Sequence, residues 1–447
     1  MRWGLAAGVV GLWLILVAWT VWRARRAAAP AGPLGEDEVL VAHASQTGLG
    51  EALAEMTAQS LRDAGVAVRL IAFSALDAET LKAARRALLI VSTTGEGDAP
   101  DSAAGFVRRV MKDAPDLSHL SYGLLALGDR EYAQFCGFGR SVDQWLRGAG
   151  AATLFDPVEV DNGDAGALRH WQHAVSQALG AAVGPAWTPP AYETWRLVER
   201  TLANPGSPGG EAWRLTLEPA NLQKGGPLPI WAAGDIAEIG PPGDPAPAAR
   251  EYSVASIPAD GRVELLVRRM QHPDGTPGLA SGWLTHDLAL GGEVPMRLRA
   301  NRAFHGPAAS TPMILIGNGT GIAGLRAHLK ARAADPAQAG AWLLFGERTS
   351  AYDRFYDDEL QAWQASGVLS RLDRCFSRDA GDGRYVQALV AEAAEDIRAW
   401  VDRGAAIYVC GSLEGMSQGV HAALEQALGA ERLADLLETG RYRRDVY

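Results

Sequence analysis

Short, mostly apolar runs alternate along much of the chain with longer stretches that are rich in Ala and Leu. Residues 39–43, 87–91 and 123–127 read VLVAH, ALLIV and GLLAL, and a polar loop follows each run. Continuous apolar runs of this length are typical of parallel strands that helices cover on both faces. They predict a doubly wound α/β domain, and the same alternation of strand and helix returns from Met313 to the end of the chain.

The pattern of apolar and polar positions changes between Tyr192 and Phe304. Residues 213–218 (WRLTLE) and 263–268 (VELLVR) are short alternating segments, and turns rich in Pro and Gly separate such segments. Alternation with a period of two is the pattern of strands that bury one face. It predicts an antiparallel β-barrel, and residues 180–190, rich in Ala, Gly and Pro, read as a linker before it.

The start of the chain follows a third pattern. The run from Trp3 to Trp22 contains no charged residue, and about 20 apolar residues are enough to cross a bilayer core. Three arginines follow this run closely and one precedes it, which places the body of the protein on the cytoplasmic side. The pattern predicts a single-pass transmembrane helix in the bacterial inner (plasma) membrane, with the soluble domains in the cytoplasm. A cleaved signal peptide ending near residues 27–29 is the alternative.

These patterns give the predicted order of segments along the chain. The predicted segments are an anchor (1–26), a tether (27–35), a doubly wound α/β domain (36–180), a linker (181–191), a β-barrel (192–306) and a second α/β domain (307–447).

Composition excludes several classes of function. The chain of 447 residues has 42 Lys and Arg against 52 Asp and Glu, a formal net charge of -10, so nucleic acid is not an expected partner. Three cysteines, Cys136, Cys375 and Cys410, are too few and too scattered for a disulfide framework or a zinc site. No metal site is therefore expected.

Three loops at the ends of predicted strands carry the first candidate site. Residues 45–51 (SQTGLGE) combine hydroxyls with free backbone N–H groups at the start of a helix, which is a phosphate cradle that needs neither lysine nor metal. Residues 92–98 (STTGEGD) and 127–132 (LGDREY) follow the two later strands. Ligands of open α/β sheets bind beyond the carboxyl ends of the strands, so the three loops are expected to converge on one site.

The motifs S-Q-T-G-x-x-E, S-T-T-G-E-G-D-x-P-D and L-G-D-x-x-Y-x-x-F-C resemble those of the FMN domain of diflavin reductases, which has a flavodoxin-like fold. The resemblance implies that the first loop holds the FMN phosphate, while the other two flank the isoalloxazine ring. Thr94 stands where such families often carry an aromatic residue. The implied FMN-binding residues are Ser45, Gln46, Thr47, Gly48, Leu49, Gly50, Ser92, Thr93, Thr94, Gly95, Leu127, Gly128, Asp129, Tyr132, Phe135 and Cys136.

The barrel segment carries a second candidate site. In the motif R-E-Y-S, Arg250 can pair with a pyrophosphate, and Tyr252 can hold a flavin through its ring and hydroxyl. This motif resembles the FAD motif of the ferredoxin-reductase-like family, and residues 278–281 resemble the diphosphate loop of that family. The implied FAD-binding residues are Arg250, Tyr252, Ser253, Gly278, Leu279, Ala280, Ser281 and Tyr447.

A glycine-rich turn, residues 317–321 (GNGTG), joins a predicted strand to a helix, and its glycines let the backbone approach a pyrophosphate. The turn resembles the Rossmann-like NADP-binding domain of the same family, in which a Ser-Arg pair, a Tyr and a Gln grip the 2′-phosphate of NADPH. Gly383 replaces the usual lysine of that motif, and Arg384 follows it. The implied NADP-binding residues are Gly319, Thr320, Gly321, Ser377, Arg378, Arg384, Tyr385 and Gln387.

The resemblance also implies a catalytic set at the nicotinamide. Family members place a serine, a cysteine and a near-terminal aspartate around this ring, and a terminal aromatic residue on the flavin. The matching residues are Ser253, Cys410, Asp445 and Tyr447. Their expected roles are to orient the nicotinamide C4 against flavin N5 and to balance the positive charge that develops as hydride leaves.

Together with the predicted anchor, these motifs favour a membrane-anchored, NADPH-dependent diflavin reductase. Hydride would pass from NADPH to FAD, and single electrons would pass through FMN to a protein or metal complex, such as a ferric siderophore or haem. One alternative is the flavoprotein component of an assimilatory sulfite reductase, which the R-D-V-Y ending resembles, although residues 235–250 lack the helical connecting domain of that family. The other is a non-enzymatic membrane-bound interaction module with degenerate flavin sites.

Acidic residues cluster on the predicted FMN loops. They predict a negative rim that steers a basic partner, with rates that depend on salt. The residues of this predicted rim are Glu96, Asp98, Asp101, Asp129 and Glu131.

Overall fold

The computed structural model describes residues 34–35, 37–113, 115–130, 132–180, 191–222, 228–243, 249–335, 337 and 339–447. The predicted anchor, most of the predicted tether and residues 181–190 of the predicted linker lie outside these residues. The described residues contain three sheets, and each sheet is the centre of one unit. We call these units the flavodoxin-like unit (34–180), the barrel unit (191–306) and the dinucleotide unit (307–447).

The flavodoxin-like unit contains a parallel sheet with strand order β2-β1-β3-β4-β5, in which β6 also pairs with β4. Its strands are β1 (Val39–Ala44), β2 (Val68–Ala72), β3 (Arg86–Ser92), β4 (Ser121–Gly128), β5 (Ala152–Thr153) and β6 (Val158–Asp161). Its α-helices are α2 (Leu49–Asp63), α3 (Ala78–Ala83), α4 (Ala104–Arg109), α5 (Gly137–Gly148) and α6 (Ala165–Leu179).

Both faces of this sheet are buried, which explains the continuous apolar runs. Leu40 and Ala42 of β1 pack with residues of α3, α4 and α5, whereas Val39 and Val41 pack with residues of α2 and α6. Successive side chains of a strand point to opposite faces, so a strand between two helical layers needs apolar residues at every position. The predicted doubly wound α/β fold is confirmed.

The barrel unit is an antiparallel sheet with strand order β10-β9-β12-β7-β8-β11. Its elements are β7 (Glu193–Leu202), β8 (Ala212–Pro219), β9 (Ile236–Ile239), β10 (Arg250–Ser253), β11 (Val263–Arg268), α7 (Leu279–Gly282) and β12 (Glu293–Arg299). Leu215 and Leu217 of β8 are fully buried, while their neighbours in the strand are partly or fully exposed. The alternating pattern therefore marks the face that lines the core of this unit.

The dinucleotide unit is a second parallel sheet, with strand order β15-β14-β13-β16-β17. Its strands are β13 (Met313–Asn318), β14 (Ala341–Glu347), β15 (Leu369–Phe376), β16 (Ala406–Gly411) and β17 (Tyr442–Val446). Its α-helices are α8 (Ile322–Ala333), α9 (Asp357–Ser366), α10 (Val386–Glu392), α11 (Ala394–Asp402), α12 (Gln418–Leu428) and α13 (Ala430–Glu438).

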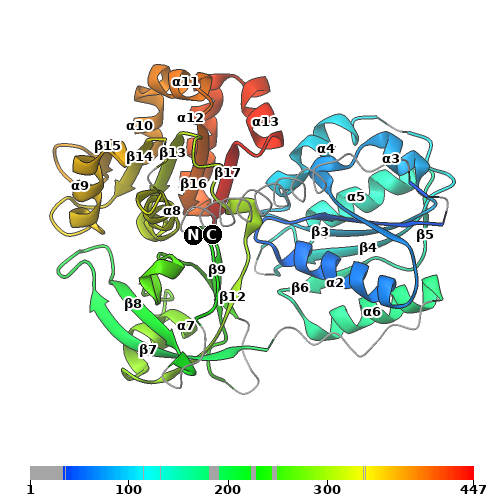
Figure 1. The fold of residues 1–447 in the computed structure, drawn as a ribbon, viewed down its shortest axis with the longest axis horizontal. Helices are drawn as coiled ribbons and strands as arrows, with labels where there is room; N and C mark the ends of the chain where they lie inside the picture. Colours follow the sequence, from blue (N-terminus) through cyan, green and yellow to red (C-terminus); the bar gives the residue numbers. More distant parts are fainter. Residues whose placement is uncertain are drawn as a thin grey trace, which may run out of the picture.

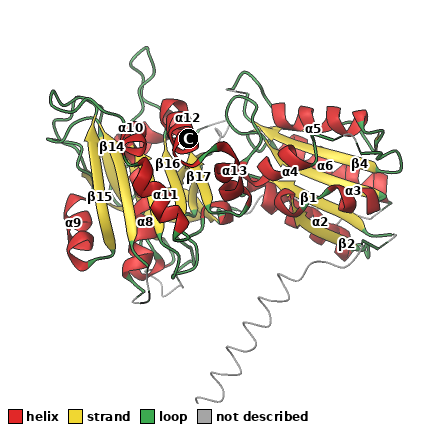
Figure 2. Cartoon of the chain, turned by 90° about the horizontal axis from the view of Figure 1, so that it is seen from above, coloured by secondary structure: helices red, strands yellow, loops and turns green. Residues whose placement is uncertain are grey.

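The C-terminal strand occupies the border between the units. Figure 1 shows β17, in red, on the side of the dinucleotide unit that faces the flavodoxin-like unit, with the barrel unit beneath it. Figure 2 shows α13 beside α4 of the flavodoxin-like unit, and these two helices are in contact. The end of the chain therefore lies where all three units meet.

Candidate active site

The first predicted loop lies between β1 and α2 and is held in shape by one side chain. The Ser45 hydroxyl accepts hydrogen bonds from the backbone N–H groups of Gly48, at 3.0 Å, and Gly50, at 3.1 Å. Gly48 has a φ of 87°, which favours glycine. A Cβ on Gly50 would lie 3.1 Å from the Ser92 hydroxyl, so the first and second loops are in contact.

The second loop follows β3 and contains buried hydroxyls that a ligand can use. Within the described residues, the hydroxyls of Thr93 and Thr94 are buried and have no hydrogen-bond partner. Buried polar atoms are nearly always bonded in folded proteins, so two adjacent orphan hydroxyls fit a site that a cofactor completes. These residues, together with the first loop, therefore fit the FMN that the sequence predicts.

The third loop follows β4 and closes against the second. A Cβ on Gly97 would lie 2.8 Å from the Gln134 side chain, and a Cβ on Gly128 would lie 2.8 Å from the backbone nitrogen of Cys136. The Cys136 thiol is fully buried, and burial raises its pKa to about 12. Cys136 is therefore a neutral structural residue, while Tyr132 and Phe135 of the same loop are partly exposed.

Three predicted catalytic residues meet where β10, β16 and β17 come together. The Ser253 hydroxyl donates a hydrogen bond of 2.7 Å to Oδ2 of Asp445, and the Cys410 sulfur lies 3.7 Å from the same oxygen. All three side chains are buried. Burial raises the pKa of Asp445 above its ordinary value, although the bonds from Ser253 and Cys410 oppose the rise. Burial also raises the pKa of the Cys410 thiol, so the thiol is neutral.

Tyr447 stands apart from these three residues. Its backbone carbonyl accepts a hydrogen bond of 2.9 Å from the Leu413 N–H, and its hydroxyl lies 3.3 Å from the Thr320 hydroxyl. As a whole residue Tyr447 is 53% exposed, although burial raises the pKa of its hydroxyl. Tyr447 therefore lies beside the glycine-rich turn, as expected of the aromatic residue that the resemblance implies.

The glycine-rich turn between β13 and α8 packs directly on β16. A Cβ on Gly321 would lie 2.2 Å from the carbonyl oxygen of Cys410, so only glycine fits there. Gly319 has a φ of 55°, and a Cβ on it would lie 3.7 Å from the Glu347 carboxylate. The turn thus brings the predicted pyrophosphate residues next to the buried catalytic set.

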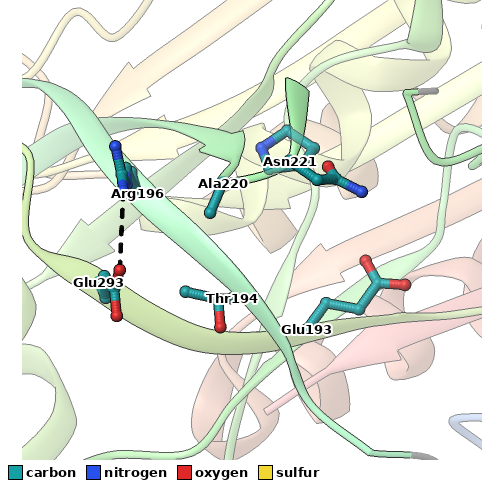
Figure 3. A pocket seen from close by; sticks show the side chains of 7 residues that line it. Glu193, Thr194, Arg196, Ala220, Asn221 and Glu293 are labelled. Atoms are coloured by element: carbon teal, nitrogen blue, oxygen red, sulfur yellow. Dashed lines mark ion pairs between the residues drawn. The ribbon is translucent and has the colours of Figure 1, made fainter. Parts of the chain in front are cut away.

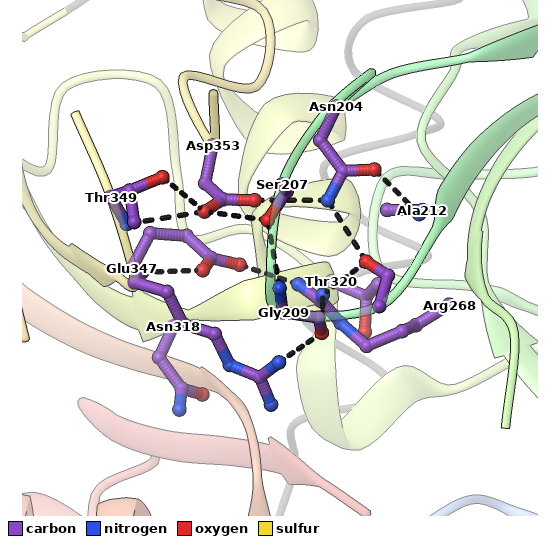
Figure 4. Close-up of polar contacts among 12 residues, drawn as sticks. Asn204, Ser207, Gly209, Ala212, Arg268, Asn318, Thr320, Glu347, Thr349 and Asp353 are labelled. Carbon is purple, nitrogen blue, oxygen red and sulfur yellow. Dashed lines mark hydrogen bonds and ion pairs between the residues drawn. The ribbon is translucent and has the colours of Figure 1, made fainter. Parts of the chain in front are cut away.

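Sequence reasoning did not identify a polar network beside this turn, which Figure 4 shows. The buried Glu347 carboxylate pairs with the Arg268 guanidinium at 2.7 Å. Arg268 also donates to the carbonyls of Gly209, at 3.0 Å, and Gly210, at 3.1 Å, in the loop between β7 and β8. The charge pair therefore ties the barrel unit to the dinucleotide unit at the edge of the predicted cofactor cleft.

The same loop is fixed by Asp353. Its carboxylate accepts hydrogen bonds from Asn204 at 2.9 Å, Ser207 at 3.1 Å and the Thr349 hydroxyl at 2.8 Å. Burial favours the neutral acid, but these hydrogen bonds prevail and hold the pKa of Asp353 below its ordinary value. The sequence separation of 149 residues between Asn204 and Asp353 left no local signal for this contact.

The predicted FAD residues lie in β10 and at the start of α7. Tyr252 is partly buried, and burial raises the pKa of its hydroxyl to about 12. The Ser281 hydroxyl accepts a hydrogen bond of 3.1 Å from the Met270 N–H, while Leu279 is 52% exposed. Arg250 is exposed. Ring, hydroxyl and guanidinium groups of this kind suit a flavin dinucleotide.

The predicted 2′-phosphate residues follow β15. The Ser377 N–H donates to the carbonyl of Glu347 at 2.8 Å, and the side chains of Arg378 and Tyr385 are exposed. Gln387, in α10, lies against Gly419. Arg384 bonds instead to two carboxylates, Asp382 at 2.6 Å and Glu392 at 2.7 Å.

The predicted 2′-phosphate residues include two arginines, Arg378 and Arg384. Arg378 is exposed and has no carboxylate partner in the described chain. Arg384 lies in a hollow of about 280 Å³ that it shares with Arg371 and Arg374. Its two carboxylates already balance its charge, so it is a weak replacement for the missing lysine.

A larger hollow, of about 470 Å³, lies on the barrel unit away from these residues (Figure 3). The 3.7 Å ion pair between Arg196 and Glu293 crosses one side of it. No predicted site residue lines this hollow, so it plays no part in the candidate site. The lining residues are Glu193, Thr194, Arg196, Pro219, Ala220, Asn221 and Glu293.

Two of the three units match models of known protein families. Residues 41–171 match the flavodoxin family model, and residues 315–422 match the model of the oxidoreductase NAD-binding domain.

Three relatives carry the name "Sulfite reductase [NADPH] flavoprotein alpha-component". The protein of Vibrio parahaemolyticus is 29% identical over 551 positions, covering 94% of this chain and 88% of the relative. That of Neisseria meningitidis serogroup C is 30% identical, with 92% and 89% covered, and that of Bacillus subtilis is 28% identical, with 94% and 91% covered. Because 551 positions exceed the 447 residues of this chain, the Vibrio relative contains segments that this chain lacks.

The predicted inner-membrane location is corrected by two findings. Among the helices that the structure describes, none is both long and apolar enough to cross a bilayer. The relatives are named as a component of a sulfite reductase, and no name among the three is that of a membrane protein. The apolar run from Trp3 to Trp22, outside the described residues, was the basis of that prediction. The comparisons do not support the predicted inner-membrane location or a membrane partner.

Proposed function

Because this chain belongs to the diflavin reductase family, we propose that it passes electrons from NADPH to a separate component of the sulfite reductase type. The chain is an NADPH-dependent flavin oxidoreductase whose cofactors are FMN and FAD. One structural observation carries the proposal. Asp445 of β17 bonds to Ser253, while its neighbour Arg444 contacts Gln46 of the predicted phosphate loop, so one strand touches both predicted flavin sites.

The division of chemistry between two flavins explains the three units. FAD supplies a group that accepts a hydride from NADPH, and FMN supplies one that releases electrons singly. For this chain we assign the FMN phosphate to the loop that Ser45 holds in shape, because its N–H groups start the 15-residue helix α2. The orphan hydroxyls of Thr93 and Thr94 follow Ser92, which meets Gly50 of α2, and we assign them to the same ligand.

The buried catalytic set provides charge and orientation. The Asp445 carboxylate is the one acid in the set, and its negative charge balances the positive charge that develops on a nicotinamide. Ser253 fixes the carboxylate through its 2.7 Å hydrogen bond. The neutral Cys410 thiol lies beside the Asp445 carboxylate, where it would help to shape a nicotinamide site without a covalent bond to substrate.

The names of the relatives favour a sulfite reductase component as the acceptor. The sequence-based preference for a ferric siderophore or haem gains no support from them, and the alternative reading fits better. A module with degenerate flavin sites is disfavoured, because the phosphate loop and the catalytic set are intact.

The test is an anaerobic titration of the purified full chain with NADPH. The proposal predicts FMN and FAD in equal amounts, bleaching of both, and electron transfer to the sulfite reductase haemoprotein of the same organism, measured as sulfide formed. A parallel assay offers a ferric siderophore in place of the haemoprotein. Sulfide formation supports the proposal, whereas reduction of the siderophore alone contradicts it.

A further inference from the structure

A closed set of hydrogen bonds joins the C-terminal strand to the flavodoxin-like unit. Nε of Arg444 lies 3.1 and 3.0 Å from the two carboxylate oxygens of Asp101, and a second guanidinium nitrogen pairs with the same group. The Gln46 amide donates to the Arg444 carbonyl at 2.8 Å and to Asp101 at 3.2 Å. The Asp101 N–H donates back to the Gln46 side-chain oxygen at 2.9 Å.

These bonds are partly shielded from water. The side chains of Arg444 and Asp101 are 23% and 15% exposed. Arg444 also lies over the ring of Tyr442, 5.8 Å from its centre. A charged, bidentate contact of this kind is both stronger and more directional than an ordinary surface ion pair.

Arg444 and Asp445 are adjacent in β17, and each contacts a different unit. Successive side chains in a strand point to opposite sides, so Arg444 and Asp445 face different neighbours. The Arg444 side chain faces Asp101 of the flavodoxin-like unit, while the Asp445 side chain faces Ser253 of the barrel unit. The backbone carbonyl of Arg444 accepts the bond from Gln46. A single peptide unit thus separates the contact with the predicted phosphate loop from the catalytic carboxylate.

Two further groups of ion pairs flank this contact, and the unit that supplies the acidic side chains differs between the two groups. On one side, Arg302 of the barrel unit bonds to Glu51 at 2.6 Å and to Glu55 at 2.7 Å, both in α2. On the other side, Glu438 at the end of α13 pairs with Arg108 and Arg109 of α4.

The acids therefore belong to the flavodoxin-like unit in the first group and to the dinucleotide unit in the second. A rotated docking would bring like charges together, so the pattern specifies one orientation.

We propose that Arg444 is a positioning residue that holds the flavodoxin-like unit in one register against the C-terminal strand. This chain lacks segments that the longer Vibrio relative contains, so side-chain contacts such as Arg444 with Asp101 carry the alignment of the units. The kinetic consequence rests on the proposed function: Arg444 controls the second phase of flavin reduction by NADPH, not the first. The docking itself does not rest on it.

The experiment compares four variants of the full chain with the unaltered protein. Arg444→Gln and Asp101→Asn each remove one charge of the pair, and Asp101→Arg with Arg444→Asp exchanges the two. Arg432→Gln is the matched control, because Arg432 forms an exposed ion pair with Asp402, and neither residue is a predicted flavin-binding residue. The first readout is small-angle X-ray scattering at low salt, and the second is stopped-flow reduction by NADPH.

Both single variants are expected to have a larger radius of gyration than the unaltered chain, and the exchanged pair and the control should match it. The first phase of flavin reduction should keep its rate, while the second should slow about tenfold in the single variants, the effect of roughly one hydrogen-bonded charge pair. Added salt should expand the unaltered chain more than Arg444→Gln, because a weakened ion pair leaves less for salt to screen.

An unchanged radius of gyration and second phase in both single variants would overturn the proposal. So would an exchanged pair that is as expanded as the single variants. Asp101→Asn changes no side-chain volume and keeps the test valid if Arg444→Gln folds poorly. If the unaltered chain fails to reduce its flavins with NADPH, the proposed function fails, but scattering still decides whether Arg444 docks the unit.

Discussion

The Ser253 hydroxyl donates a 2.7 Å hydrogen bond to Asp445, although 192 residues separate them in the chain. Ser253 ends β10 of the barrel unit, and Asp445 lies in the C-terminal strand of the dinucleotide unit. The bond therefore forms only when these two units are docked. It makes the candidate hydride site a product of the interface and not of either unit alone.

The first prediction concerns the pH dependence of flavin reduction. Burial raises the pKa of Asp445, and in the proposed mechanism the ionised carboxylate is the form that stabilises positive charge on the nicotinamide. The rate constant for reduction by NADPH should be at its full value above the raised pKa and should decline as pH falls through it. Asp445→Asn should lower the rate constant about 100-fold, the typical effect of removing one preorganised electrostatic contact.

The measurement is a stopped-flow pH profile from about pH 5 to about pH 9, the range in which a raised carboxyl pKa shows as a rate limb. Asp402→Asn, at an exposed ion pair, is the control and should keep the profile of the unaltered chain. An acid limb that persists unchanged in Asp445→Asn would assign the titration to another group.

The sequence predicted the three flavodoxin-like loops because their placement follows from local order. Parallel strands end at one edge of a sheet, so polar residues after β1, β3 and β4 must lie close together. The meeting of Ser253 with Asp445 came from a family resemblance, since no local pattern says that β17 pairs with β16 beside the barrel.

Charged residues show the limit of sequence reasoning most clearly. Asp101 was predicted to be part of an acidic rim for an external partner, and the structure pairs it with Arg444 of the same chain. The pairing of Glu347 with Arg268 gave no signal, because the two residues lie 79 positions apart and on different units. Charge signs can be read from a sequence, but which opposite charges meet depends on the docking of units.

A second prediction tests the close approach at the glycine-rich turn. In Gly321→Ala the new methyl group would lie 2.2 Å from the Cys410 carbonyl oxygen, so α8 or β16 must shift. The variant should lose about 1–3 kcal/mol of unfolding free energy, as overpacked sites do, and should bind NADPH more weakly. Urea unfolding and a binding titration measure the two effects.

Gly381→Ala is the matched control for this prediction. A Cβ at Gly381 meets no atom within 4 Å, so the variant should unfold at the same urea concentration as the unaltered chain. Equal losses of unfolding free energy in the two alanine variants would show that the close approach of Gly321 to β16 does not cause the loss in Gly321→Ala.

A third prediction separates the two arginines near the predicted 2′-phosphate site. Arg378 is exposed and free of carboxylate partners in the described chain, whereas Arg384 is bonded to Asp382 and Glu392. Arg378→Ala should raise the KM for NADPH about 10- to 100-fold, the loss of a charge-assisted phosphate contact, with little effect on NADH. Arg384→Ala should have the smaller effect on KM for NADPH. Steady-state kinetics with both nucleotides test this order, and the reverse order would place the 2′-phosphate against Arg384.

The last prediction concerns the buried pair of Glu347 and Arg268. The Glu347 side chain is 2% exposed, and burial raises its pKa while the Arg268 charge opposes the rise. Arg268→Gln removes that opposing charge, so the variant should lose about 3–5 kcal/mol of unfolding free energy at neutral pH, the cost of an unpaired buried charge. The pKa of Glu347 should then rise further. A carboxyl group with a raised pKa in the folded state favours folding at low pH and loses that contribution as pH rises through the raised pKa.

The loss in Arg268→Gln should therefore be smaller at about pH 5 than at about pH 8, because the folded variant can protonate Glu347 in acid. The double variant Arg268→Gln with Glu347→Gln leaves no buried charge and should recover much of the stability. Arg432→Gln, which opens an exposed pair, should cost roughly 0–1 kcal/mol at either pH. Urea unfolding of the three variants at both pH values measures these differences. A loss in Arg268→Gln that does not depend on pH would mean that hydrogen bonds from Arg268 to the loop at Gly209, and not its charge, hold the two units together.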